Sequence, residues 1–153
     1  MEKILVSACL HGEKLRYDGG DKEVDHIIWQ RWQTEGRIVS ICPEVSGGLS
    51  VPRLPAEIID AHTVINTAQE DVTDAFLAGA ENALKRAQEH NIRLAVLTEN
   101  SPSCGSQFIY DGSFNGKKIV GEGLTTRLLR RHGIQVFSER QLQDAQAYLE
   151  KLL

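Results

Sequence analysis

The run Ile4-Leu5-Val6-Ser7-Ala8-Cys9 opens the chain and sets a pattern that two later segments repeat. It is short, apolar and rich in β-branched residues, which is typical of a buried strand, and it ends on a cysteine close to Gly12. The two later runs of the same form are Arg37-Ile38-Val39-Ser40-Ile41-Cys42, and Leu94-Ala95-Val96-Leu97, which precedes Cys104. The sequence therefore predicts three strands whose carboxyl ends each lead to a cysteine.

Helical patterns separate these strands along the chain. Apolar residues recur with helical spacing in residues 23–35, 74–90, 124–132 and 139–152, and residues 134–137 form a fourth strand-like run. Strands that alternate with helices of this length predict βαβ units. We therefore expect an α/β fold: a Rossmann-like, three-layer arrangement in which a mostly parallel sheet of about four to five strands has helices on both faces. Residues 63–66 predict an extra edge strand, residues 43–55 a loop, and the turn signals within 108–118 a hairpin.

Length and composition narrow the class of protein. The chain has 153 residues, 41% hydrophobic and 25% charged, which predicts one soluble domain spanning residues 1–153. A net charge of −4 makes nucleic acid an unlikely partner, since such binding rests on basic surfaces. The absence of a leader-like segment and of a membrane-length apolar run predicts a cytoplasmic protein with no membrane partner. Nothing in the composition indicates the oligomeric state.

The three cysteines are candidates for one metal site. Parallel strands bring their carboxyl ends to one edge of a sheet, where ligands bind, so Cys9, Cys42 and Cys104 should meet there. Their odd number and wide spacing argue against a disulfide framework. Thiolates suit zinc, copper(I) and iron–sulfur clusters, and a cubane cluster normally takes four cysteines, so three would leave one iron open. Two alternatives stay open: a zinc ion held by the cysteines and His11, and three buried thiols without a ligand.

Polar residues beside the cysteines suggest chemistry at this site. Glu44 follows Cys42 closely and is a candidate general acid or base, the alternative being a solvated loop residue. Ser101 and Ser103 precede Cys104, and their hydroxyls are candidate donors to a substrate or to cluster sulfur, although serines are also common in turns.

The remaining candidates concern substrate binding. Gly47 and Gly48 allow the backbone to approach a ligand closely, but they belong to no phosphate-binding pattern. Arg53 is a candidate partner for a substrate oxygen or for an anionic cluster.

Three segments, in order, resemble the signatures of a small bacterial domain family associated with 2-thiouracil desulfurase. They are Val6-Ser7-Ala8-Cys9-Leu10-His11-Gly12 with Arg16-Tyr17-Asp18-Gly19, Cys42-Pro43-Glu44-Val45-Ser46-Gly47-Gly48-Leu49 with Pro52-Arg53 and Pro55-Ala56-Glu57, and Ser101-Pro102-Ser103-Cys104-Gly105. The resemblance covers nearly the whole chain. One departure is Thr98, where the family is expected to have lysine.

The resemblance implies a specific cofactor and reaction. It implies an oxygen-sensitive [4Fe–4S] cluster with three cysteine ligands, Cys9, Cys42 and Cys104, whose fourth iron takes the sulfur of a thiolated pyrimidine. It implies that Glu44 and Ser101 act as the acid–base and substrate-positioning pair. The reaction implied is a hydrolytic, non-redox cleavage of a C–S bond that converts 2-thiouracil to uracil and sulfide.

These observations leave a leading hypothesis and two competitors. The first is a desulfurase whose partner is a small thiolated nucleobase. The second is an iron–sulfur or zinc module that serves as a sensor or sulfur carrier without catalysis. The third is a Rossmann-like small-molecule binder whose cysteines are only structural.

Overall fold

A four-stranded parallel sheet lies at the centre of the molecule, in the order β2-β1-β5-β8. The structure is a computed structural model that describes residues 1–153. The strands are β1 (Ile4–Ser7), β2 (Ile38–Ile41), β5 (Leu94–Leu97) and β8 (Gln135–Ser138). In register, Ile4 lies between Ile38 and Leu94. The three strands that lead to cysteines are therefore direct neighbours.

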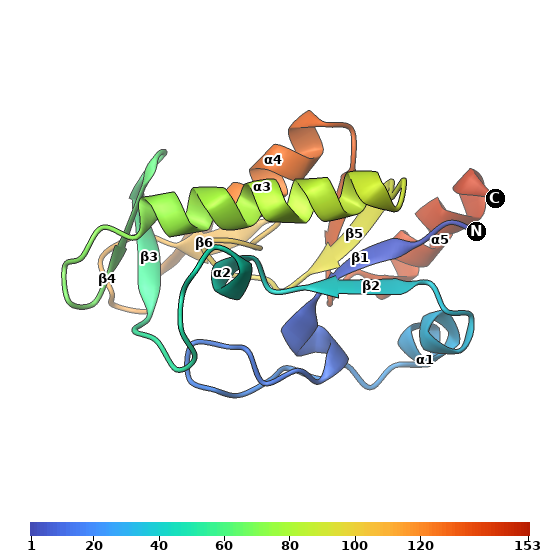
Figure 1. Ribbon diagram of the computed structural model, residues 1–153, viewed down its shortest axis with the longest axis horizontal. Coiled ribbons are helices and arrows are strands. Elements are labelled where there is room, and N and C mark those ends of the chain that lie inside the picture. The colour runs from blue at the N-terminus through green and yellow to red at the C-terminus, as the bar shows by residue number, and fades with distance from the viewer.

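Helices cover both faces of this sheet, as Figure 1 shows for α3 above it and α1 below. Helices α3 (Thr73–Glu89) and α4 (Leu124–Arg131) pack on one face, and α1 (Ile27–Thr34) and α5 (Leu142–Leu152) pack on the other. Successive residues of β1 point to opposite faces, so Leu5 joins the core under α3 and α4, whereas Ile4 and Val6 pack against Trp29 and Trp32. The expected three-layer, Rossmann-like α/β fold is confirmed.

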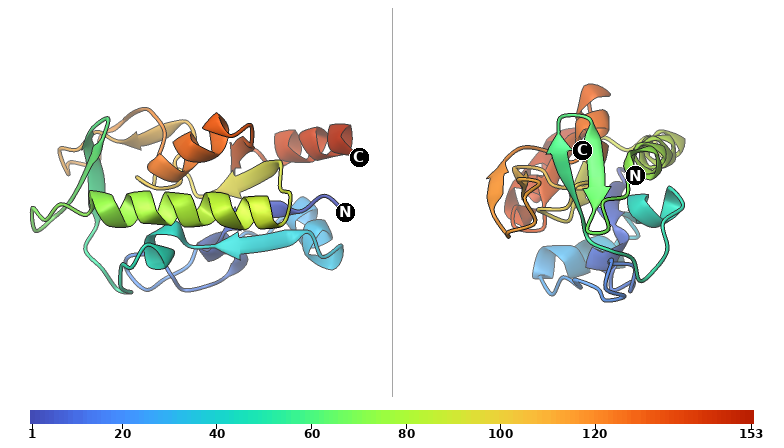
Figure 2. Two further views of the ribbon diagram at one scale, coloured as in Figure 1. Left: turned by 45° about the horizontal axis from the view of Figure 1, so that its top comes forward. Right: turned by 90° about the vertical axis from the view of Figure 1, so that its left-hand side faces the viewer.

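Two antiparallel hairpins extend the molecule beyond the carboxyl edge of the sheet. They are β3 (Ala56–Asp60) with β4 (Thr63–Asn66), and β6 (Phe108–Tyr110) with β7 (Lys118–Val120). The end-on view of Figure 2 shows β3 and β4 next to the amino end of α3. A small apolar cluster fixes both hairpins to α3 and α4; its members are Ile58, Val64, Phe76, Ile109 and Leu124. The predicted hairpin in 108–118 and the strand at 63–66 are both confirmed.

Some local predictions differ from the structure. The last helix begins at Leu142 rather than at residue 139. The first helix begins at Ile27 rather than at residue 23, because the ring of His26 caps it by accepting the N–H of Ile28 at 3.1 Å. The expected loop 43–55 begins with a short helix, α2 (Pro43–Ser46). Strand β3 was not predicted. No helix is both long and apolar enough to cross a membrane.

Candidate active site

The three cysteines line a single cavity of about 390 Å³ beyond the carboxyl ends of β1, β2 and β5. Cys9 lies in a 3-10 turn, η1 (Ala8–His11), directly after β1. Cys42 follows β2 and is the N-cap of α2, where Pro43 begins the helix with a residue that needs no N–H partner. Cys104 lies in the loop after β5. The parallel sheet thus brings together residues that are up to 95 positions apart, the separation of Cys9 and Cys104 (104 minus 9).

This cavity lies where the strand order reverses. From β1 the chain moves to β2 on one side, and then crosses to β5 on the other side of β1. Such a reversal separates the loops that follow two neighbouring strands, and it is where open α/β sheets bind their ligands. Cys9 follows the strand on one side of this point, and Thr98 follows the strand on the other.

Burial raises the pKa of all three thiols above the ordinary value. At Cys9, burial is the largest cause of the raised pKa. The hydrogen bond with Thr98 lowers this pKa, and the charge of Cys42 raises it. At Cys104, the charges of Glu44 and Cys9 add to the effect of burial. Burial and the charges of neighbouring groups therefore favour the neutral, protonated form of the three thiols.

The residues around the three thiols do not form a site for a single metal ion. No three His, Cys, Asp or Glu side chains are placed as ligands of one metal ion. His11, the fourth ligand of the zinc alternative, does not line the cavity; its Nδ1 lies 3.3 Å from Nε2 of Gln33 and its ring packs against Trp29. Three thiols spread around a cavity, with no fourth soft ligand, suit a group that distributes its ligands over several irons.

Glu44 and Ser101 are brought together in the wall of the same cavity. Oε2 of Glu44 accepts a hydrogen bond from Nε of Arg53 at 2.8 Å and forms an ion pair with Nη2 of the same residue at 2.6 Å. The Ser101 hydroxyl donates to Oε1 of Glu44 at 3.3 Å. Arg53 is itself fixed, because it also donates to the carbonyls of Ser50 and Leu15. One carboxylate oxygen is thereby anchored by a nearly buried guanidinium, and the other is left with a single weak partner.

Ser101 also shapes the loop that carries Cys104. Its Oγ accepts the backbone N–H groups of Ser103 and Cys104, at 3.0 and 3.1 Å. This is a local side-chain cap of a tight turn, of the kind that serines favour. One hydroxyl therefore links the position of a cysteine to that of Glu44.

Three residues expected to bind substrate lie elsewhere. Ser103 is fully buried, and its Oγ lies 2.9 Å from Oγ1 of Thr125. Gly47 is where α2 crosses α3, since a Cβ on Gly47 would lie 2.0 Å from the carbonyl oxygen of Ala75. Gly48 has a φ of +106°. None of the three lines the cavity, so their positions indicate packing and turn geometry.

The segment between β5 and Ser101 holds site residues that the sequence did not reveal. Glu99 lines the cavity and is 3% exposed. Its Oε1 accepts the backbone N–H groups of Asn100, Ser106, Gln107 and Phe108, and its Oε2 accepts the Ser106 hydroxyl. Burial opposes its ionisation, yet these hydrogen bonds hold its pKa below the ordinary value. Glu99 is thus the centre around which the loop to β6 folds.

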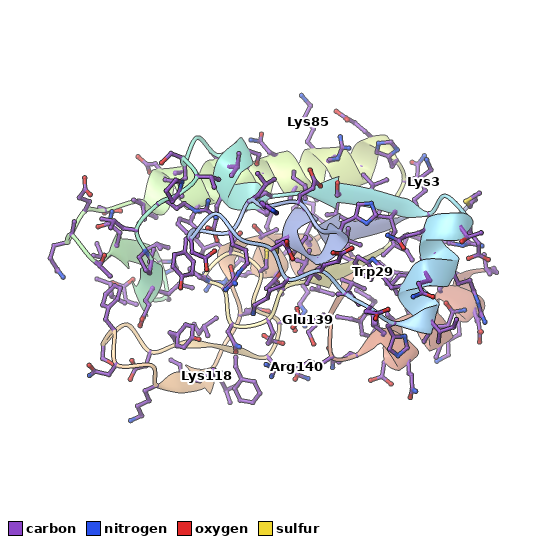
Figure 3. The ribbon with its side chains drawn as sticks, turned by 90° about the horizontal axis from the view of Figure 1, so that it is seen from below. Lys3, Trp29, Lys85, Lys118, Glu139 and Arg140 are labelled. Carbon is purple, nitrogen blue, oxygen red and sulfur yellow. The ribbon has the colours of Figure 1, made fainter.

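Two further residues lie next to Glu99: Asn100, which follows it in the chain, and Glu139, which contacts it from the end of β8. Asn100 has a φ of +69°, and its buried Oδ1 has no hydrogen-bond partner in the protein. Glu139, labelled in Figure 3, accepts the backbone N–H of Glu99 with both carboxylate oxygens, and its burial raises its pKa. A polar run, Thr98-Glu99-Asn100, directly after a buried strand was the signal that could have identified this segment.

An α/β protein with a thiol-lined ligand cavity at the switch point of its sheet is the class that these features define. The family model for 2-thiouracil desulfurase matches residues 4–141, and the chain belongs to that family. The uncharacterized protein YbbK of Bacillus subtilis (strain 168) is 43% identical over 150 residues, covering 92% of this chain and 98% of YbbK. The solved structure of a [4Fe-4S]-dependent thiouracil desulfidase, TudS, is 50% identical with a TM-score of 0.96, covering 98% of this chain and 99% of TudS. The resemblance seen in the three motifs is confirmed.

Proposed function

We propose that this protein is a [4Fe–4S]-dependent enzyme that hydrolyses the C–S bond of a thiolated pyrimidine such as 2-thiouracil. The observation that carries the proposal is that Cys9, Cys42 and Cys104 line one cavity with the Glu44–Ser101 pair. Family membership and the similarity to TudS support the same cofactor and substrate class. The reaction balances without electron transfer: the thiocarbonyl and water give a carbonyl and hydrogen sulfide.

Cys9, Cys42 and Cys104 would hold the cluster as thiolates. Because burial raises the pKa of these thiols, cluster binding would release their protons. When bound, the cluster supplies an iron without a cysteine ligand, a Lewis acid for thiocarbonyl sulfur.

Glu44 is the proposed general base. Arg53 anchors Oε2, which leaves Oε1 to take a proton from water on the cavity side. Because Ser101 contacts both Oε1 of Glu44 and the backbone of Cys104, it fixes the position of the carboxylate relative to this loop. Its hydroxyl can also rotate to donate to an oxygen or nitrogen atom of the substrate. Holding water, base and the reacting carbon together is a proximity effect worth several powers of ten in rate. Asn100 also lines the cavity, and its side-chain Oδ1, which has no hydrogen-bond partner in the protein, is a further polar group that could contact a substrate.

The oxygen atom of the product tests this chemistry. The anaerobically reconstituted protein is given 2-thiouracil in water labelled with oxygen-18, and the uracil is analysed by mass spectrometry. One labelled oxygen in each new uracil is the expected result. Unlabelled uracil, formed while the solvent label is intact, would contradict hydrolysis by water. Cluster binding with no uracil at all would instead favour a sensor or carrier.

A further inference from the structure

We propose, resting on the proposed function, that Thr98 is a positioning residue that donates a hydrogen bond to Cys9 in the cluster-bound protein and raises the reduction potential of the cluster. Thr98 follows β5 and Cys9 follows β1, so this contact joins two neighbouring strands across the switch point. Oγ1 of Thr98 lies 3.0 Å from Sγ of Cys9. Both residues line the cavity.

The Thr98 hydroxyl is held in place by its surroundings. The side chain is 7% exposed, and its backbone N–H donates to the Ser7 hydroxyl at 2.9 Å. A β-branched side chain has few rotamers, which limits where Oγ1 can point. Oγ1 makes no other hydrogen bond in the protein, so Cys9 is the only protein partner for this hydroxyl.

Chemistry fixes the direction of this hydrogen bond once a metal is bound. In the free protein either atom can be the donor. A cysteine that ligates a metal is a thiolate and has no proton to give. The hydroxyl of Thr98 must then be the donor, and Sγ of Cys9 the acceptor.

A hydrogen bond to a ligand sulfur changes the electron density at a cluster. The reduced cluster carries one more negative charge than the oxidised one, so a donor at the sulfur stabilises the reduced form more and raises the potential. Thr98 therefore makes Cys9 a weaker electron donor to iron. A more electron-poor cluster is also the better Lewis acid for a soft sulfur atom.

The partners of the other cysteines make Thr98 the experimentally accessible case. Backbone N–H groups of Val45 and Glu44 serve Cys42, and these cannot be removed by substitution. The hydroxyls beside Cys104 belong to Ser7 and Ser103. Ser7 also accepts the backbone N–H of Thr98 and Ser103 also contacts Thr125, so removing either hydroxyl would disturb more than one contact. Thr98→Val removes only the hydroxyl and keeps the branched shape. Thr98→Ser keeps the hydroxyl, and Thr34→Val makes the same chemical change on the exposed end of α1.

The test is a redox titration of the reconstituted proteins, followed by the spectrum of the reduced cluster. Thr98→Val should shift the midpoint potential to a more negative value, whereas Thr98→Ser and Thr34→Val should keep that of the wild type. Thr98→Ala removes the same hydroxyl and should give a shift of the same sign. Loss of the cluster from both Thr98→Val and Thr98→Ala, with retention in Thr98→Ser, would also support the hydrogen bond.

An unchanged potential in Thr98→Val, at full iron content, would overturn the role of Thr98 and leave the proposed function standing. A wild-type protein that binds no cluster under anaerobic reconstitution would overturn both. The two failures are distinguished by the iron and sulfide content of the wild type.

Discussion

At the scale of single residues, each cysteine is the only thiol that its strand delivers to the cavity. Cys9→Ser, Cys42→Ser and Cys104→Ser should therefore each lose most of the iron and acid-labile sulfide, because serine is a poor ligand for iron in such clusters. Iron and sulfide analysis after anaerobic reconstitution measures this, with circular dichroism to check folding. Ser113→Ala, in the turn between β6 and β7 and outside the cavity, should keep its cluster. A serine variant with full iron content would contradict the ligand assignment.

A substitution of Glu44, the proposed general base, tests turnover separately from cluster binding. Glu44→Gln keeps the shape of the side chain but cannot accept a proton, so kcat should fall by roughly 10²–10⁴-fold, the usual contribution of a general base. The iron content should stay at the wild-type level. Initial rates of uracil formation at saturating substrate, divided by cluster content, check both statements. A Glu44→Gln enzyme with a near-normal kcat would exclude this role.

Some residues of this site could be predicted from the sequence and others could not, for a physical reason. Cys9, Cys42, Glu44 and Cys104 could be predicted because each directly follows a strand-like run or lies within a short motif. The contacts of Thr98 and Glu99 could not, because their partners are far away in the chain or are backbone groups that come close only after folding; the polar run after the strand indicates only that the segment is unusual. Ser103, Gly47 and Gly48 lie in the same motifs but face the core, a neighbouring helix or a turn.

At the scale of elements, the crossing of α2 and α3 positions the short helix that carries Glu44. A Cβ on Gly79 would lie 2.0 Å from the carbonyl oxygen of Pro43, so neither backbone can stay where it is. Gly79→Ala should lower the free energy of unfolding by about 1–3 kcal/mol, as overpacking of a close contact does. Urea unfolding of the cluster-free protein measures this change. Ala78→Ser, on the exposed face of the same helix, is the matched control and should change stability little.

The loop after β5 depends on the ionised carboxylate of Glu99. Its pKa is lowered in the folded protein, so its contribution to stability is full above the ordinary glutamate value near 4.5 and is lost as pH falls through the lower, folded value. Glu99→Gln should cost about 2 kcal/mol at neutral pH, the scale of hydrogen bonds to a charged group. The difference between wild type and variant should shrink in acid. Urea unfolding at neutral and acid pH tests this, and a gap that does not depend on pH would contradict it.

The length of an element and the residues that precede it explain which parts of the fold could be predicted. Helix α3 has 17 residues, long enough for its apolar face to repeat several times. Helix α2 has four residues, too few for any periodicity, and β3 comes directly after a stretch rich in glycine and proline. Strand β3, with five residues, is no shorter than the predicted strands, so length does not explain why it was missed. Both α2 and β3 owe their structure to contacts with the rest of the chain.

At the scale of the whole molecule, the site exists only because the sheet is assembled in one particular order. β1 lies between β2 and β5, which brings three cysteine-bearing loops to one edge. Alternating strands and helices predicted the parallel sheet, and the sheet predicted the meeting of the cysteines. The hairpins that close the far side of the cavity, and the size of that cavity, depend on packing that no short motif encodes.

We propose above that this molecule uses a cluster on three cysteines to hydrolyse a thiolated pyrimidine. The most direct measurement is sulfide and uracil release from 2-thiouracil by the anaerobically reconstituted protein, with no added reductant or oxidant. We expect many turnovers that yield equal amounts of sulfide and uracil. A protein with a complete cluster that releases neither product, or that does so only when an electron donor is supplied, would contradict it.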